Sequence, residues 1–224
     1  MEVERMIDLS SIPNESSLMD DSLKKQLSGV FSKLQSPVVI KAIADVKEQK
    51  GMELASFLKA ISALSPKLSL ELYTPEESGK VPELDTSYLP VTGLFKDGAY
   101  GRAAFCGIPG GKEINSFVLA VYNLSGPGKK VDKYLKKRID SLKKPVKIKI
   151  CVSLACHYCP AVVAACQQIA ILNPQIEAVM IDAGLYPQLV ETYKIERIPM
   201  MILNDSQVIL GSKTMEEIIT LLNK

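Results

Sequence analysis

The chain has 224 residues, enough for one large domain or for two small ones that each bury a hydrophobic core. Hydrophobic residues make up 47% of the sequence, an ordinary share for a globular protein, and the formal net charge is only +2. So small a net charge gives no electrostatic reason to expect nucleic acid or a membrane surface as a partner. The five cysteines are an odd number, which argues against a secreted disulfide scaffold.

The amino-terminal residues 1–5 lack the basic and then apolar layout of a signal peptide. No uninterrupted apolar run approaches the roughly 18 residues that a transmembrane helix needs. We therefore expect a cytoplasmic protein.

The first half of the chain predicts alternating strands and helices. After an amino-terminal extension, residues 1–16, apolar residues recur near helical spacing over residues 17–35. The segments that follow are expected in the order strand, helix, strand, polar loop, two strands joined by a turn, and helix. Their ranges are 37–43, 50–64, 68–73, 74–88, 89–95, 100–105 and 112–124. These elements make up a first unit over residues 17–126.

A glycine-rich break and a basic segment separate the two halves. Residues 125–128 end the preceding helix, and residues 127–145 form a linker. Within it, residues 129–144 predict a basic amphipathic helix. Its apolar side holds Val131, Tyr134, Leu135, Ile139 and Leu142. The eight basic residues of this segment fit either a solvated surface or a docking site for an acidic partner.

The second half, residues 146–224, repeats the order of elements found in the first. Its strands are expected at 146–152, 176–181, 198–204 and 208–210, and its helices at 161–172, 186–194 and 214–222. Leu89-Pro90-Val91 of the first unit corresponds to Ile198-Pro199-Met200 of the second, and Gly107 corresponds to Gly211. The chain is therefore expected to contain two tandem repeats.

Only the second repeat carries a pair of cysteines. Cys156-His157-Tyr158-Cys159-Pro160 places two thiols one helical turn apart, where an apolar strand leads into a helix. At a helix N-terminus, unpaired N–H groups and the helix dipole favour a thiolate, the nucleophilic form of cysteine. The corresponding turn of the first repeat, after Ile43, contains no cysteine. The first repeat is expected to keep the plan of the second without its chemistry.

Two other interpretations of the cysteine pair remain open. A zinc knuckle needs two more ligands, but the sequence has neither a second C-x-x-C nor a histidine pair, since His157 is its only histidine. A static disulfide that closes so small a loop would constrain the unfolded chain little. We prefer a reversible dithiol and expect no metal. Cys151 and Cys166 are expected to be buried and inert, whereas Cys106 stays unassigned.

Pro199 favours the redox interpretation. It opens an apolar strand at the place where thioredoxin-like folds, which this order of elements resembles, put a cis proline beside a dithiol. The stretch between Cys159 and Pro199 leaves room for one strand, one helix and their turns. We expect the Ile198–Pro199 peptide to be cis, although most X-Pro bonds are trans.

Together these motifs resemble the N-terminal domain of the flavoprotein component of alkyl hydroperoxide reductase, the AhpF family, which is similar to tandem-thioredoxin protein disulfide oxidoreductases. The resemblance covers residues 17–224. It rests on residues 107–113, Ser116 and 118–120 in the first repeat, and on residues 153–160, Val162-Val163, 172–174, 181–182 and 198–199 in the second.

The resemblance implies an α/β fold of two tandem thioredoxin-like units packed together, the first without a dithiol. It implies a thiol-disulfide oxidoreductase, in which Cys156 and Cys159 accept electrons from a flavin-dependent reductase module and pass them to a peroxiredoxin for hydroperoxide reduction. FAD and NADH are expected on that module and not on this chain, which has no Gly-x-Gly-x-x-Gly loop. The implied catalytic residues are Cys156, Cys159, Glu113 and Pro199.

Glu113 has a different interpretation when it is taken alone. From the residues around it, Glu113 is expected to start a helix and to complement the helix dipole. The resemblance implies instead an acid/base group that reaches from the first repeat to the dithiol.

Two further functions remain open. One is a stand-alone glutaredoxin-like protein disulfide oxidoreductase or isomerase that acts on general protein disulfides. The other makes the first repeat a peptide-binding module, with the dithiol as a redox switch on binding.

Overall fold

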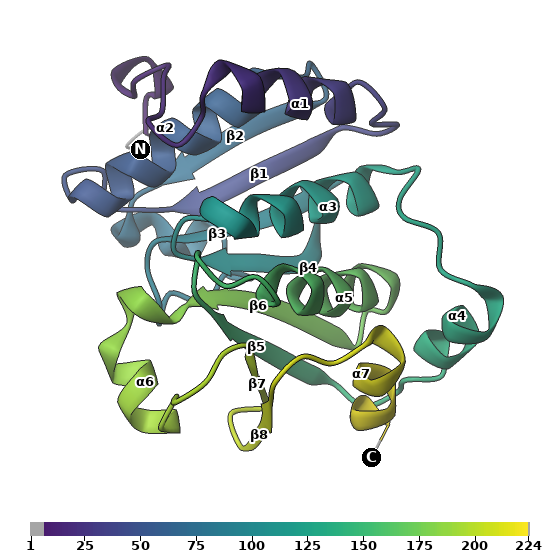
Figure 1. The fold of residues 1–224 in the computed structure, drawn as a ribbon. Coiled ribbons are helices and arrows are strands. Elements are labelled where there is room, and N and C mark those ends of the chain that lie inside the picture. Colours follow the sequence, from purple (N-terminus) through teal and green to yellow (C-terminus); the bar gives the residue numbers. More distant parts are fainter. Residues whose placement is uncertain (1–6, 224) are drawn as a thin grey trace.

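A single eight-stranded sheet, of strand order β2-β1-β3-β4-β6-β5-β7-β8, runs through the protein (Figure 1). The structure is a computed structural model that describes residues 7–223. The strands are β1 (Val38–Ile43), β2 (Leu68–Tyr73), β3 (Val91–Lys96), β4 (Ala99–Cys106), β5 (Val146–Val152), β6 (Ile176–Asp182), β7 (Met200–Leu203) and β8 (Gln207–Leu210). The helices are α1 (Asp21–Phe31), α2 (Gln49–Ser62), α3 (Ile114–Ser125), α4 (Lys133–Asp140), α5 (Cys159–Leu172), α6 (Pro187–Tyr193) and α7 (Met215–Leu222).

The two halves of the sheet have the same pairing. In the first, β1 pairs in parallel with β2 and antiparallel with β3, which pairs antiparallel with β4. In the second, β5 pairs in the same way with β6 and β7, and β7 with β8. A parallel pairing of β4 with β6 joins the halves. The expected α/β fold of two tandem thioredoxin-like units is confirmed. The boundaries at 16/17, 126/127 and 145/146 stay predictions, because a continuous sheet does not itself divide the chain.

The two repeats also match in local backbone geometry. The Leu89–Pro90 and Ile198–Pro199 peptides are both cis, as expected for the second. The carbonyl oxygen of Pro90 accepts a hydrogen bond from the N–H of Gly107 at 2.8 Å, and that of Pro199 accepts one from Gly211 at 2.9 Å. Both glycines have a positive φ, a conformation that glycine adopts without the steric penalty of a Cβ. The correspondence predicted between these positions is therefore confirmed.

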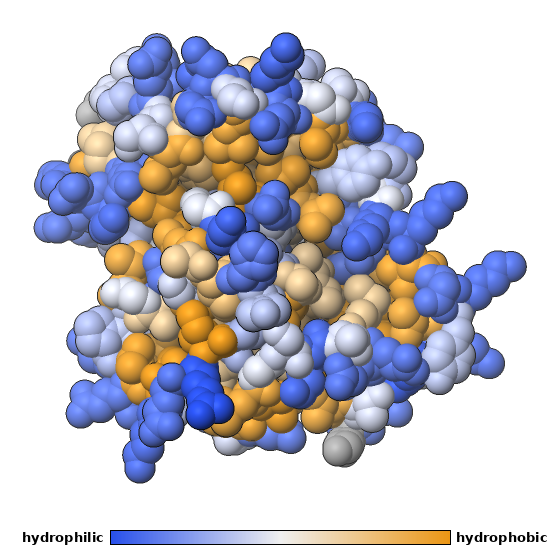
Figure 2. All heavy atoms as spheres, in the orientation of Figure 1, coloured by the Kyte–Doolittle hydropathy of each residue, from blue (hydrophilic) through white to orange (hydrophobic). Residues whose placement is uncertain are grey.

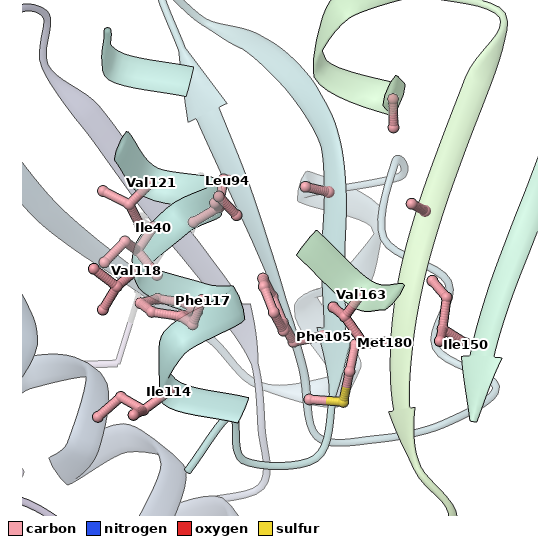
Figure 3. Close-up of a cluster of buried hydrophobic side chains, with 14 of the residues drawn as sticks. Ile40, Leu94, Phe105, Ile114, Phe117, Val118, Val121, Ile150, Val163 and Met180 are labelled. Carbon is pink, nitrogen blue, oxygen red and sulfur yellow. The ribbon is translucent and has the colours of Figure 1, made fainter. Parts of the chain in front are cut away.

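One hydrophobic core lies between the sheet and the helices α3 and α5 and passes from one repeat to the other. Phe105 of β4, Phe117 of α3 and Val163 of α5 are all fully buried. Figure 3 shows Phe105 between the other two, and the ring centroids of Phe105 and Phe117 lie 5.1 Å apart. Burial of each such side chain stabilises the fold by about 1.5–3 kcal/mol. The two repeats are therefore packed together through shared interior side chains.

The surface over α3 and α5 differs in hydropathy from the edge of the same face. Figure 2 shows hydrophobic and weakly polar side chains over much of this face, interrupted near its centre by a few hydrophilic ones, and many hydrophilic side chains around its edge. In the part of the chain that the structure describes, no helix combines the length and the apolar character that crossing a membrane requires.

Two helices are shorter at both ends than their apolar patterns predict, and aspartate N-caps account for their late starts. The helix expected over residues 17–35 is α1, which starts after Asp20, whose carboxylate accepts a hydrogen bond from the N–H of Leu23 at 2.7 Å. The helix expected over residues 129–144 is α4, which starts after Asp132, whose carboxylate accepts hydrogen bonds from two backbone N–H groups.

The apolar side predicted for the linker helix is only partly correct. Ile139 and Leu142 are buried, but the ring of Tyr134 is 63% exposed and lies under the guanidinium group of Arg138, 5.5 Å from it. The polar loop expected over residues 74–88 contains a short 3₁₀ helix, Pro75–Lys80.

Candidate redox site

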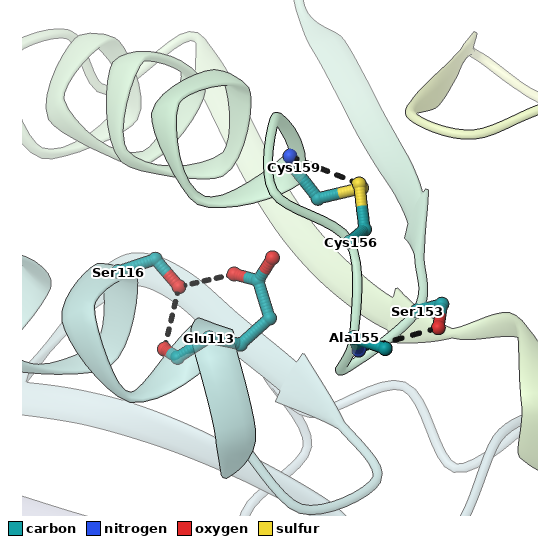
Figure 4. Close-up of a disulfide and its surroundings, with 6 residues drawn as sticks. All are labelled: Glu113, Ser116, Ser153, Ala155, Cys156 and Cys159. Carbon is teal, nitrogen blue, oxygen red and sulfur yellow. Dashed lines mark hydrogen bonds between the residues drawn. A yellow bond between two sulfur atoms is a disulfide. The ribbon is translucent and has the colours of Figure 1, made fainter.

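A disulfide joins the two cysteines of the C-x-x-C motif at the point where β5 leads into α5 (Figure 4). The helix α5 begins at Cys159, so Cys156 lies in the preceding turn and not in the helix itself. The carbonyl oxygen of Ser153 closes this turn by accepting a hydrogen bond from the N–H of Cys156 at 2.9 Å. The N–H of Cys159 points at the Sγ atom of Cys156, 3.1 Å away. Such a donor at a helix start favours negative charge on the sulfur once the disulfide is reduced.

The two sulfur-bearing residues differ in exposure. Cys159 is fully buried, whereas Cys156 is partly exposed and precedes the exposed His157. Tyr158 is 70% exposed, an uncommon position for a tyrosine ring. A disulfide of another protein therefore reaches Cys156 more readily than Cys159.

Glu113 reaches this site from the first repeat. It ends a short 3₁₀ helix, Gly111–Glu113, that leads into α3, and its side chain is fully buried. Figure 4 shows its carboxyl group directed towards the disulfide. The neighbouring Lys112 donates its backbone N–H to the carbonyl oxygen of Leu154, at 2.9 Å. The structure thus brings Glu113 of the first repeat and the cysteine pair of the second to one site, and the acid/base role implied for Glu113 stays a prediction.

Gly111 allows this close approach of the two repeats. It has a φ of +53°, which disfavours residues with a Cβ, and a Cβ built there would lie 2.7 Å from the carbonyl oxygen of Leu154. Any other residue would push the turn that holds Glu113 away from the turn that holds the disulfide.

The surroundings of Glu113 raise the pKa of its carboxyl group towards neutral pH. Burial raises the pKa of Glu113 to about 7, the hydroxyl group of Ser116 opposes this shift by donating a hydrogen bond to Oε2, and the negative charge of Asp182 adds to it. The other oxygen, Oε1, is buried and has no hydrogen-bond partner among residues 7–223. A carboxyl group with a pKa near 7 can both release and accept a proton at neutral pH.

Pro199 lies at the same end of the sheet. It immediately precedes β7, whose first residue, Met200, pairs with Cys151 near the end of β5. The cis peptide and its strand therefore start beside the turn that carries Cys156.

The remaining three cysteines are free and buried. Cys151 and Cys166 are fully buried, and burial raises the pKa of both thiols to about 12. Burial also raises the pKa of the Cys106 thiol. The predicted burial of Cys151 and Cys166 is confirmed, and Cys106 proves to be buried as well. Within residues 7–223 no group of three or more His, Cys, Asp or Glu side chains is arranged to hold a metal ion.

Sequence reasoning assigns no individual role to Ser116 or to Asp182. The spacing of three between Glu113 and Ser116 is a detectable signal, because residues three apart on a helix are neighbours. Asp182 gives no such local signal, since the pairing of β4 with β6 brings it to this site.

The comparison with known sequences agrees with this geometry. A thioredoxin domain family matches residues 146–223, which form the second repeat. The alkyl hydroperoxide reductase component AhpF from Pseudomonas aeruginosa is 31% identical over 202 residues, which make up 90% of this chain and 37% of that protein. The chain therefore spans a little over a third of the length of the curated relatives it matches.

Solved structures match more than nine-tenths of this chain. The NTD_N/C domain of AhpF from Enterococcus faecalis is 43% identical, with a TM-score of 0.86 over 91% of this chain and 99% of that structure. A protein disulfide oxidoreductase from Aeropyrum pernix has a TM-score of 0.82 over 93% of this chain and 94% of that structure, but at 22% identity the likeness concerns the fold alone. With two thioredoxin-like units, of which only the second holds the C-x-x-C disulfide, the chain belongs to the AhpF family of alkyl hydroperoxide reductase components and corresponds to its N-terminal domain.

Proposed function

We propose that this protein is a thiol-disulfide oxidoreductase that carries electrons from a flavin-dependent reductase module, in cis or in trans, to a peroxiredoxin, which reduces hydroperoxides. The observation that carries the proposal is the disulfide between an accessible Cys156 and a buried Cys159, next to a buried carboxyl group. The relatives' extra length supports a reductase module outside this chain, where FAD and NADH would bind. The proposed location is the cytoplasm, which cell fractionation would test.

The transfer to the peroxiredoxin balances as two thiol-disulfide exchanges. The Cys156 thiolate attacks the peroxiredoxin disulfide, forms a mixed disulfide and displaces one peroxiredoxin sulfur as a thiolate. The Cys159 thiol then gives its proton to Glu113 and attacks the Cys156 sulfur, which releases the second peroxiredoxin sulfur as a thiolate. Two electrons pass to the peroxiredoxin, whose thiolates take up protons from Glu113 or solvent, and this protein returns to its disulfide form.

Reduction by the flavin module runs the same steps in reverse. A thiolate of the module attacks Cys156, and Cys159 leaves as a thiolate that takes a proton from Glu113. A second thiolate of the module then resolves the mixed disulfide and releases Cys156. A Glu113 pKa near 7 supports both directions, because both protonation states are populated at neutral pH.

Pro199 is proposed to border the reacting sulfurs without reacting itself. It lies beside the turn of Cys156, and a proline has no backbone N–H to compete for the sulfur. An extended segment of the partner could pair with the backbone just before it, at Ile198.

A single-turnover experiment tests the proposal against a general disulfide oxidoreductase. The reduced protein is mixed rapidly with an oxidised peroxiredoxin of an alkyl hydroperoxide reductase system and, separately, with insulin. We expect transfer to the peroxiredoxin to be at least about tenfold faster, loss of transfer in Cys156→Ser, and retention in the thiol control Cys166→Ala. Equal rates for the two substrates would favour the general disulfide oxidoreductase.

A further inference from the structure

Three parallel strands end together at the redox site, and the last residue of the central one is a buried carboxylate, Asp182. Both β4 and β5 pair in parallel with β6, so the carboxyl ends of all three meet at one edge of the sheet. From there β4 continues to Glu113, and β5 continues to Cys156. Functional groups in α/β proteins gather at this kind of edge.

Asp182 contacts both chain segments that leave this edge. It pairs in register with Val152, the last residue before the turn that holds the disulfide. On the other side, a Cβ built on Gly107 would lie 3.2 Å from the Cβ of Asp182. The backbone that leads to Glu113 therefore passes directly against Asp182.

The carboxylate of Asp182 has few partners of its own. It is 8% exposed, and its Oδ1 atom accepts a hydrogen bond from the N–H of Gly184 at 3.1 Å. Among residues 7–223 it forms no ion pair. Most of its negative charge therefore remains to act on other groups at this edge.

Glu113, to which β4 leads from this edge, is one of those groups, since the negative charge of Asp182 adds to the rise of its pKa. Two buried carboxyl groups that interact resist being ionised together, so the charge of one holds the proton on the other. Glu113 is fully buried and has one oxygen without a hydrogen-bond partner in the described part of the chain, whereas Asp182 keeps slight exposure and a hydrogen-bond donor. Asp182 is therefore the member of the pair that ionises first.

The other titratable groups that act on Glu113 or Asp182 do not supply the negative charge that the Asp182 carboxylate provides. Burial raises the pKa of Asp182, and the N–H of Gly184 and the cation of Lys50 oppose that shift. Lys50 is half exposed and also pairs with Glu53 at 2.8 Å, so solvent screens its effect. Burial also raises the pKa of the Cys106 thiol and of the Tyr186 hydroxyl, which leaves both groups neutral.

We propose that Asp182 is a positioning residue of the redox site, whose carboxylate keeps on Glu113 the proton that Cys159 takes when the disulfide is reduced. Asp182 itself transfers no proton; it stays ionised while Glu113 gains and loses one. The inference rests on the proposed function, in which Glu113 exchanges that proton with the dithiol.

The substitution Asp182→Asn tests this charge while keeping the shape of the side chain. Asparagine retains an oxygen that can accept from Gly184. A second variant, Asp182→Ser, keeps a smaller acceptor in case the amide disturbs folding. The matched control is Asp97→Asn, in the turn between β3 and β4, at the opposite end of β4 from Cys106. It removes the same charge at a φ of 52°, which asparagine tolerates.

The measurement is the carbon-13 NMR signal of the Glu113 side-chain carboxyl group in the oxidised full chain, followed against pH. The signal is assigned by its loss in Glu113→Gln. We expect the midpoint of its titration to move to lower pH in Asp182→Asn and Asp182→Ser, because removing a negative charge makes Glu113 easier to ionise. The midpoint is expected to stay unchanged in Asp97→Asn.

An unchanged Glu113 midpoint in a folded Asp182 variant would overturn the inference, whatever its activity. A shift of equal size in Asp97→Asn would also overturn it, since the effect would then be one of net charge. If the midpoint moves only in the Asp182 variants, the inference holds. A Glu113→Gln variant that reduces the peroxiredoxin with the unaltered pH profile would then refute the proposed proton exchange and not the coupling of the two carboxyl groups.

Discussion

The backbone N–H of Lys112 donates a hydrogen bond to the carbonyl oxygen of Leu154, at 2.9 Å, and this contact joins the two repeats at the redox site. Lys112 is next to Glu113, and Leu154 lies two residues before Cys156. The contact therefore couples the position of a buried carboxyl group in one repeat to that of a disulfide in the other. Through this contact the first repeat, which has no dithiol, holds Glu113 at the redox site of the second, where we propose that it exchanges a proton with the dithiol.

Replacing Gly111 with alanine is expected to separate these two turns. The new Cβ would meet the carbonyl oxygen of Leu154 in addition to the cost of a positive φ. Gly98→Ala is the matched control, because Gly98 also has a positive φ but no atom of residues 7–223 outside its own neighbours lies within 4 Å of its Cβ position. We expect urea unfolding to show a loss of about 1 kcal/mol for Gly98→Ala and a clearly larger loss for Gly111→Ala. Equal losses of unfolding free energy in the two variants would show that the new contact with Leu154 does not destabilise the protein.

Glu113→Gln is expected to change the dependence of stability on pH. The pKa of Glu113 rises from its ordinary value of 4.5 to about 7 in the folded protein, so between these values the folded state binds more protons than the unfolded state. Stability then falls as pH rises through this window, by an amount on the order of 3 kcal/mol, and the neutral glutamine removes that fall.

Urea unfolding of both oxidised proteins at pH 4.5, 6 and 8 measures this effect. Relative to the unmodified protein, Glu113→Gln should gain stability as pH rises. A difference that stays constant across these pH values would contradict the raised pKa of Glu113.

The two cysteines of the motif are expected to react differently with alkylating agents. In the reduced protein Cys156 should react first, because it is partly exposed and accepts the N–H of Cys159, whereas Cys159 is fully buried. Cys159→Ser should accumulate a mixed disulfide with the peroxiredoxin, and Cys156→Ser should not. Mass spectrometry of briefly labelled protein identifies the site, and faster labelling of Cys159 would reverse the proposed roles.

The three free cysteines are expected to be unreactive in the native state. Cys106, Cys151 and Cys166 are at most 1% exposed, and burial raises the pKa of each thiol. Native oxidised protein should therefore take up no iodoacetamide over minutes, and unfolded oxidised protein should take up three equivalents. Rapid native labelling of Cys166 would be incompatible with its position on the inner side of α5.

The parts of the fold that were predictable from sequence depend on local patterns. The prolines at 90 and 199 and the glycines at 107 and 211 mark corresponding turns, and these turns have the same hydrogen bond in both repeats. The late starts of α1 and α4 follow from Asp20 and Asp132, which are recognisable capping residues but which the apolar pattern alone did not reveal.

The environment of Glu113 could not be predicted in the same way. Its burial depends on the parallel pairing of β4 with β6, two strands that are far apart in the sequence. No local spacing reveals that Asp182, the last residue of β6, lies between the chain segments that lead to Glu113 and to Cys156. The family resemblance implied a role for Glu113, but only the folded arrangement gives the physical cause of its raised pKa.

We propose above all that electrons pass through Cys156 on their way from a flavin module to a peroxiredoxin. Peroxide-dependent NADH oxidation, reconstituted from a flavin reductase module of a relative, this protein and a peroxiredoxin, tests it most directly. We predict that the rate depends on all three proteins, falls to background with Cys156→Ser and is retained with Cys166→Ala. A flavin module that reduces the peroxiredoxin equally fast without this protein, or with Cys156→Ser in its place, would contradict the account.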